Sequence, residues 1–197
     1  MAFPTTGVLD NFSTDMSAWT VLVGGASVSS GRCVGDVGGQ NRIARTTPTY
    51  GPDSEAYVGV PVKGSNGDWF NLFVRMTTLV NSTFDGYCLA IDYGTTDSWN
   101  IQEMLNGDFT NLPGGPVALD FTAGDQIGIE IIGSAIKGYR NGGTAVISAS
   151  DGTYASAGYI GGDIALSTQR WDDFGGGTYT AGGATPTPMQ MMMGIGT

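Results

Sequence analysis

The chain has 197 residues, of which 18 are acidic and 8 basic, and its formal net charge is −10 with no histidine. Such a field repels nucleic acid and anionic membranes, because both are bound through clustered lysine and arginine. The missing histidine excludes Ser–His and Cys–His nucleophilic catalysis and leaves no Cys/His cluster for zinc. No window of about 18 apolar residues occurs, so we expect no membrane span.

Glycine is abundant, with 33 residues, and Thr, Ser, Val and aromatic residues fill the segments between glycines. This composition favours strands and turns over helices. No linker-like segment precedes the last dozen or so residues. We therefore expect one β-sandwich domain with a short N-terminal arm over residues 1–183, followed by a Thr/Pro- and Met-rich tail over 184–197.

The first half of the chain is a series of short strand-like segments between turns. Cys33 and Cys88 lie in two of them, and we expect free, buried thiols, since a disulfide would require neighbouring strands. Residues 46–52, with two prolines, are expected to be a loop. The expected strands are 7–12, 15–23, 27–33, 38–45, 54–62, 69–77 and 86–93.

The second half contains the stretch around which we expect the fold to be organised, residues 125–166. Its isoleucines at 127, 129 and 131 alternate with Gly128 and Glu130, which is typical of a strand with one buried face. Further strands are expected at 98–103, 117–121, 135–140, 144–148, 159–166 and 171–174.

Tight turns join the four strands of the 125–166 stretch, including a turn at Asn141-Gly142-Gly143, whose residues tolerate positive φ. They predict a four-stranded antiparallel meander at the core of the fold. Turn signals recur about every 8–12 residues along the chain, which is the spacing of an all-β sandwich or jelly roll.

Several short motifs carry a resemblance to a known family. They are Asp10-Asn11-Phe12 with Trp19, Gly-Asp-x-Ile-Gly at 124–128, Tyr-x-Asn-Gly at 139–142 and Trp-Asp-Asp-Phe at 171–174. With these motifs the chain resembles the concanavalin A-like, laminin-G-like jelly-roll superfamily over about residues 7–176. In particular it resembles the stand-alone versions found among tailed-bacteriophage virion proteins, such as minor tail and capsid-decoration proteins.

The resemblance implies a non-enzymatic structural protein, a capsid-decoration or minor tail protein. Its partners would be capsid or tail proteins and copies of itself. The N-terminus shows no signal peptide, so the expected location is the virion after synthesis in the host cytoplasm. The superfamily also contains lectins, so the alternative is a glycan-binding module, and an endo-glycosidase is third.

Catalysis is not expected, because glycosidases need two carboxylates that face each other across the scissile bond. The Glu-x-Asp-x-x-Glu signature of the superfamily's enzymes is absent. Glu103 and Glu130 have no acidic residue at even spacing nearby. We therefore expect no catalytic residues.

A candidate glycan site lies in the segment DYGTTDSWN, where aromatic and polar residues stand close together. Sugar-binding sandwiches use aromatic platforms with polar side chains that hold hydroxyl groups. The alternative is that Trp99 packs in the sandwich and Asp97 caps a turn, since aromatic residues bury large areas. The candidate residues are Tyr93, Asp97, Trp99 and Asn100.

No cofactor is expected beyond a calcium ion, for which the chain offers one candidate set of ligands. The first and last strands of this fold commonly lie side by side, which would bring Asp10 near Asp172 and Asp173. Three carboxylates in one patch repel one another unless a cation or hydrogen bonds compensate them. The alternative is a solvated acidic rim, because no compact D-x-D-x-D-G loop exists.

The tail combines a stiff Thr-Pro-Thr-Pro spacer with a run of methionines. Flexible apolar side chains suit a partner surface, so we expect docking through Met189, Met191, Met192 and Met193. A loose chain end is the alternative.

Overall fold

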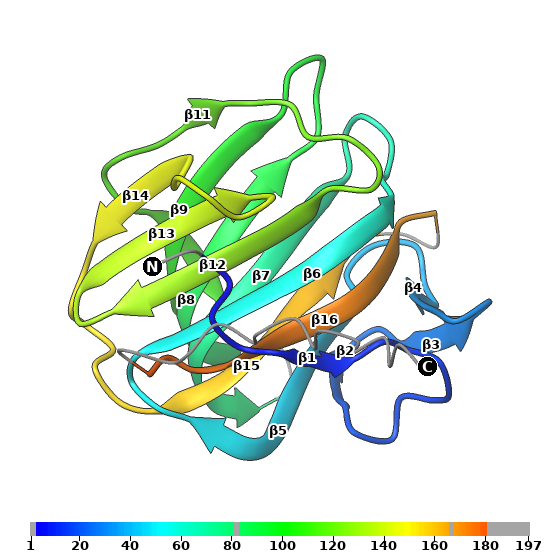
Figure 1. Ribbon diagram of the computed structural model, residues 1–197, viewed down its shortest axis with the longest axis horizontal. Coiled ribbons are helices and arrows are strands. Elements are labelled where there is room, and N and C mark those ends of the chain that lie inside the picture. The colour runs from blue at the N-terminus through cyan, green and yellow to red at the C-terminus, as the bar shows by residue number, and fades with distance from the viewer. Residues whose placement is uncertain (1–2, 81–82, 166–167, 181–197) are drawn as a thin grey trace, which may run out of the picture.

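The computed structural model describes residues 3–80, 83–165 and 168–180. These residues form 16 strands and no helix, and the strands make two antiparallel sheets packed face to face (Figure 1). The expected all-β sandwich is confirmed. Because the described ranges hold no helix, none could cross a membrane.

The first sheet, here called sheet A, contains the first and last strands of the chain. Its order is β14-β13-β12-β6-β16-β4-β3, and β1 pairs with β16. The strands of sheet A are β1 (Val8–Asp10), β3 (Ala26–Ser29), β4 (Arg32–Gly35), β6 (Ser54–Val62), β12 (Gln126–Ile132), β13 (Ala135–Arg140), β14 (Ile147–Ser150) and β16 (Arg170–Thr178).

The second sheet, sheet B, lies behind sheet A in Figure 1. Its order is β10-β9-β8-β7-β15-β5-β2, and β11 pairs with β9. The strands of sheet B are β2 (Thr20–Val23), β5 (Arg42–Tyr50), β7 (Trp69–Val80), β8 (Thr83–Asp92), β9 (Ser98–Leu105), β10 (Asp108–Asn111), β11 (Val117–Ala118) and β15 (Gly158–Ile164).

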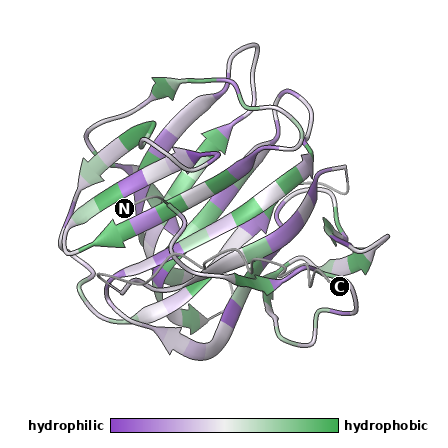
Figure 2. Ribbon diagram, viewed as in Figure 1, coloured by the Kyte–Doolittle hydropathy of each residue, from purple (hydrophilic) through white to green (hydrophobic). Residues whose placement is uncertain are grey.

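The main core fills the space between the two sheets. Ile127, Ile129 and Ile131 of β12 are fully buried there, as their alternation predicts, and they face residues of β7 such as Phe70 and Leu72. Hydrophobic and hydrophilic residues alternate along these strands (Figure 2). Successive side chains of a strand point to opposite faces, so every strand also presents a second set of residues outward.

The predicted four-stranded meander is only partly correct. Strands β12, β13 and β14 form it at one end of sheet A, but β15 lies in sheet B between β7 and β5. Residues 151–157 therefore carry the chain from one layer to the other. An alternating hydrophobic pattern indicates one buried face for a strand in either sheet. The pattern of β15 therefore could not show whether this strand belongs to sheet A or to sheet B.

Several other strand boundaries differ from expectation, and β10 was not predicted. Two of these differences have a clear physical cause. The predicted 27–33 strand is two strands, β3 and β4, because Ser30 and Gly31 both take positive φ and turn the chain. The predicted loop 46–52 instead continues β5 as far as Tyr50, which pairs with Gly158. Pro48 does not prevent pairing because it lies at an exposed position of the strand, and Pro52 lies beyond the end of β5.

Several strand glycines lie under aromatic rings. A Cβ atom on Gly128 would collide with the ring of Phe3, and one on Gly162 with Trp171. A Cβ atom on Gly175 would meet Tyr57 in the same way. Part of the high glycine content therefore makes room for rings rather than for turns.

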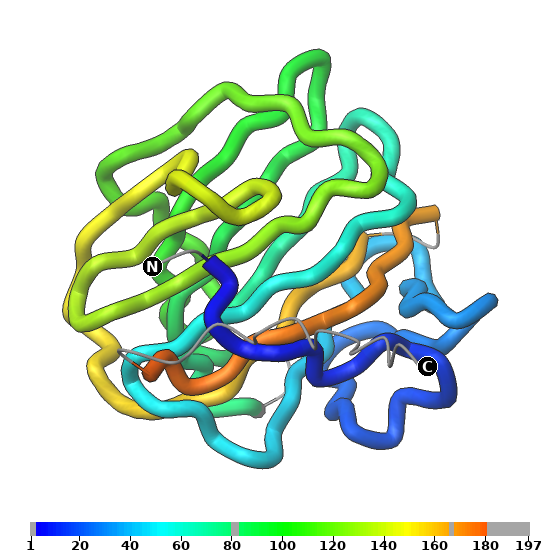
Figure 3. Tube along the Cα trace, viewed as in Figure 1, coloured from blue at the N-terminus to red at the C-terminus, as the bar shows by residue number. Residues whose placement is uncertain are grey.

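The N-terminal arm crosses the outer face of sheet A (Figure 3, dark blue). Phe3 is only 5% exposed, because its ring stacks on Tyr139 at 4.2 Å and meets the edge of Tyr57. The two cysteines are free and buried, as expected. Burial raises the pKa of both thiols.

Candidate functional site

The predicted glycan-binding residues lie in the interior. Tyr93, Asp97 and Trp99 gather around the ring of Phe121, and none of the three is more than 4% exposed. The indole Nε1 of Trp99 donates to the carbonyl of Leu119 at 2.6 Å. This placement favours the packing alternative for Trp99, because its ring has no face open to a sugar.

The remaining members of that segment are also enclosed. Asn100 is 5% exposed. The Asp97 carboxylate accepts from Lys63 Nζ at 2.5 Å and from the amide of Phe121 at 3.1 Å. Lys63 also lies over the rings of Tyr93 and Phe121. Asp97 thus compensates a lysine held against aromatic rings instead of capping a surface turn.

The residues predicted to bind calcium are close in the fold but are used differently. Strands β1 and β16 pair as expected, with Asp10 opposite Phe174. The Asp10 carboxylate accepts from the Phe12 amide at 2.8 Å and from Trp19 Nε1 at 2.7 Å. Asp172 accepts from the amide of Asp173.

No group of three or more acidic, cysteine or histidine side chains within the described ranges is arranged to hold a metal ion. The predicted set of Asp10, Asp172 and Asp173 therefore does not fit a calcium ion. Calcium remains a prediction, and the thermal midpoint with and without a chelator tests it. The predicted docking residues Met189, Met191, Met192 and Met193 lie outside the described residues.

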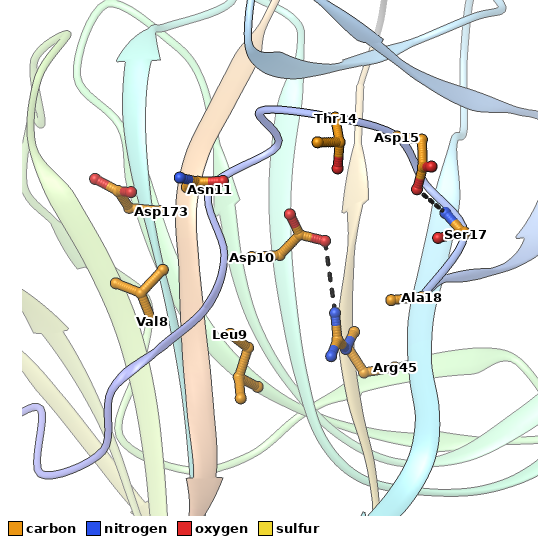
Figure 4. A pocket seen from close by; sticks show the side chains of 10 residues that line it. All are labelled: Val8, Leu9, Asp10, Asn11, Thr14, Asp15, Ser17, Ala18, Arg45 and Asp173. Carbon is orange, nitrogen blue, oxygen red and sulfur yellow. Dashed lines mark hydrogen bonds and ion pairs between the residues drawn. The ribbon is translucent and has the colours of Figure 1, made fainter.

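A polar cavity of about 550 Å³ lies beside β1, and we call it the N-terminal cavity (Figure 4). Asp10 and Asp173 both line it, and Arg45 extends from β5 toward Asp10, with 3.5 Å between Nη1 and Oδ2. Hydrogen bonding from the side chain and from the amide of Ser17 lowers the pKa of the Asp15 carboxyl. No aromatic ring lines the cavity, so it lacks a stacking surface for a sugar.

Two glutamates form a pair that the sequence alone did not reveal. Glu55 of β6 lies directly opposite Glu130 of β12 on the outer face of sheet A. Glu55 Oε1 accepts from the amides of Thr5 and Thr6 and from the Thr6 hydroxyl, at 2.6–2.7 Å. Glu130 accepts from the hydroxyl of Tyr139 at 3.0 Å. The arm covers Glu55, which is fully buried, and Glu130 beside it is only 7% exposed, so the pair is enclosed.

The outer face of sheet B carries a groove of about 260 Å³, which we call the outer groove. Trp69 of β7 is half-buried there and lies opposite the exposed Asp92 of β8. Their neighbours Phe70 and Ile91 point into the core, so Trp69 and Asp92 must point outward. The residues that line the outer groove are Gln40, Trp69, Asn71, Ala90, Asp92, Gln102 and Phe109.

The polar groups of the outer groove are largely unused by the protein. Within the described ranges, the Asp92 carboxylate and Gln102 Oε1 accept no hydrogen bond from another side chain or amide, whereas Gln102 Nε2 donates to Asn111 at 2.8 Å. Asn71 accepts weakly from the Cys88 thiol at 3.5 Å, and its Nδ2 donates to no described residue. Partial burial raises the pKa of the Asp92 carboxyl. The groove therefore combines aromatic surface with free acceptors and a free donor.

A buried ion pair supports one wall of the groove. Arg42 of β5 is 2% exposed and its Nη2 lies 3.1 Å from Oδ2 of Asp163, which is fully buried. The guanidinium stacks over Phe84, at 4.3 Å from the ring centroid, and over Phe109, at 5.6 Å. Phe109 is thereby held in place at the edge of the groove.

The outer groove was not predicted from the sequence. Trp69 was predicted correctly to lie in a hydrophobic strand, but its position on the outer face of sheet B was not predicted. The signal was present in the alternation of the segment WFNLF, which puts Trp69 and Asn71 on the face opposite Phe70 and Leu72.

No protein-family model and no curated protein matches this sequence. Solved structures do share the fold. The carbohydrate-binding module CBM66 from Bacillus subtilis has 17% identity and a TM-score of 0.66, with 87% of this chain and 99% of that chain covered. The exoplasmic/lumenal domain of VIP36, in a form bound to Ca²⁺ and Man3GlcNAc, has 14% identity and a TM-score of 0.62, covering 94% and 93%.

A third structure is a GH43 protein, the BlXynB mutant from Bacillus licheniformis, with 14% identity and a TM-score of 0.58. The match covers 86% of this chain but only 39% of that protein. At these identities the likeness concerns the fold alone, and it has no bearing on the predicted virion role, which stays a prediction. The chain is an antiparallel β-sandwich with the concanavalin A-like jelly-roll fold.

Proposed function

We propose that this protein is a non-enzymatic glycan-binding module and that a sugar residue binds in the outer groove, against Trp69. The observation that carries the proposal is the groove itself, where a half-exposed indole lies opposite a carboxylate and beside unpaired amide groups. Sugars present apolar C–H faces and hydroxyl groups that both donate and accept. A ligand site of this kind needs apolar surface and a few convergent polar groups.

In the proposed complex each residue has a distinct role. The C–H face of the sugar packs on Trp69, because an aromatic ring offers a large, rigid apolar surface. Asp92 and Gln102 Oε1 accept from hydroxyl groups, and Asn71 Nδ2 donates to a hydroxyl oxygen. The fold supports this proposal, since CBM66 is named as a carbohydrate-binding module and VIP36 was solved with Man3GlcNAc.

The test is a glycan array followed by titration calorimetry on the strongest ligand. We expect Trp69→Ala to weaken binding by about 30-fold or more, as for a central aromatic contact worth about 2 kcal/mol. Asn11→Ala, in the N-terminal cavity, is the matched control and should bind like the wild type. Thermal midpoints show whether each variant is folded.

Two results would contradict the proposal. One is an array with no ligand for the wild-type protein. The other is a folded Trp69→Ala variant whose affinity equals that of the wild type, particularly if Asn11→Ala then loses binding and moves the site to the N-terminal cavity.

A further inference from the structure

The charge around the outer groove is one-sided. Asp92 is the only ionisable side chain in its lining, and neither lysine nor arginine contributes to it. Its other polar members, including Gln40 and Asn71, are amides. A bound carboxylate would therefore meet an anion in the groove and no accessible counter-charge from the lining.

Arg42, which packs against the groove residue Phe109, is not available to a ligand. Arg42 lies behind Phe109, is only 2% exposed and is paired with Asp163 at 3.1 Å. To reach a ligand it would have to leave a fully buried carboxylate without its partner, which is strongly unfavourable. The net charge of −10 adds a repulsive field at longer range.

The size of the groove limits what can lie against Asp92. Its volume of about 260 Å³ is below the roughly 300–1,000 Å³ of sites for drug-sized ligands. The space suits one sugar residue, so any charged substituent on that residue would lie close to the Asp92 carboxylate.

We infer that the outer groove selects an uncharged sugar residue and rejects one that carries a carboxylate. This inference rests on the proposed function and specifies its substrate class. The selection acts through the unpaired Asp92 and through the neutralised Arg42, so it is a property of the groove and not of the overall fold.

The test compares a neutral oligosaccharide that binds on the array with the same oligosaccharide after oxidation of its primary hydroxyls to carboxylates. We expect the oxidised form to bind at least about tenfold more weakly, since like charges at close range repel. Asp92→Asn should reduce this difference by at least about threefold, because it removes the charge and keeps the shape.

Gln40→Lys supplies the missing cation at the exposed edge of the groove and should improve binding of the oxidised form by about fivefold. Val8→Lys on β1 in sheet A changes the net charge equally and should leave the preference unchanged. The inference is overturned if the wild type binds both forms equally, or if Gln40→Lys shifts the preference no more than Val8→Lys does. Binding of neither form by the wild type would instead remove the proposed function itself.

Discussion

The outer faces of the two sheets carry similar side chains but differ in what covers them. On sheet A, Tyr57, Tyr139 and Glu55 lie beneath the N-terminal arm, and Glu55 accepts three hydrogen bonds from it. On sheet B, Trp69 and Asp92 have no such partner within the described ranges. Aromatic and acidic side chains therefore contribute to stability on sheet A, where the arm covers them. On sheet B, similar side chains are uncovered and are available to a ligand.

The comparison also explains why the acidic pair on sheet A does not indicate catalysis. Glu55 and Glu130 lie opposite each other on neighbouring strands, but Glu55 is fully buried beneath the arm and Glu130 is only 7% exposed. Burial of polar groups is tolerated when hydrogen bonds compensate it, as they do for Glu55 Oε1.

The largest change in the free energy of unfolding is expected when the buried ion pair between Arg42 and Asp163 in sheet B is broken. Arg42→Met should lower the free energy of unfolding by about 3–5 kcal/mol, because Asp163 is left charged and buried. Urea unfolding measures this loss. The double variant Arg42→Met/Asp163→Leu should recover part of it, and a double variant as unstable as the single one would show that the pair is not the cause.

A smaller loss of stability, without loss of glycan binding, is expected from a substitution on the outer face of sheet A. Phe3→Ala should lower the free energy of unfolding by about 2 kcal/mol, because the apolar contact with Tyr139 is lost. Its glycan affinity should match the wild type, since the arm lies on the other sheet. If Phe3→Ala weakened glycan binding without loss of stability, the assignment of the two faces would be reversed.

Asn71→Leu tests the free donor of the outer groove. The two side chains have similar size, so stability should change by less than about 1 kcal/mol. Glycan affinity should fall about tenfold, corresponding to about 1.4 kcal/mol for one lost hydrogen bond. Calorimetry measures the affinity, and an unchanged value in a folded variant would place the donor elsewhere.

The smallest effect concerns pH. Partial desolvation in the groove raises the pKa of the Asp92 carboxyl, so this group takes up its proton at a higher pH than an ordinary aspartate does. Glycan binding should weaken by about fivefold as the pH falls through that raised pKa, because the protonated group accepts less well. Asp92→Asn should bind weakly at every pH, and an equally steep pH profile in this variant would exclude Asp92 as the titrating group.

Much of the fold could be predicted from the sequence, because strand alternation and turn residues are local signals. Ile127, Ile129 and Ile131 identified a buried face correctly. The assignment of β15 to the wrong sheet shows the limit, since pairing partners depend on contacts between distant segments. Local patterns contain no information on which layer a strand joins.

The candidate site could be predicted less well, for a related reason. Trp99 lies between Ser98 and Asn100, whereas Trp69 begins the apolar segment WFNLF, yet Trp99 is fully buried and Trp69 lines the outer groove. The polar neighbours of Trp99 suggested a surface position, whereas the apolar neighbours of Trp69 suggested a core position. Only the three-dimensional structure shows which face of each strand is covered.

The glycines that lie against aromatic rings limit which substitutions this protein tolerates. An aromatic ring lies directly against the backbone at three strand glycines, which are Gly128, Gly162 and Gly175. Even an alanine at one of these positions would displace the aromatic ring that lies against it. Mutational scanning should therefore find that these three glycines tolerate no substitution, although they lie in regular strands. Related chains should then retain each glycine together with its aromatic partner, and such residue pairs offer a way to recognise distant relatives at low sequence identity.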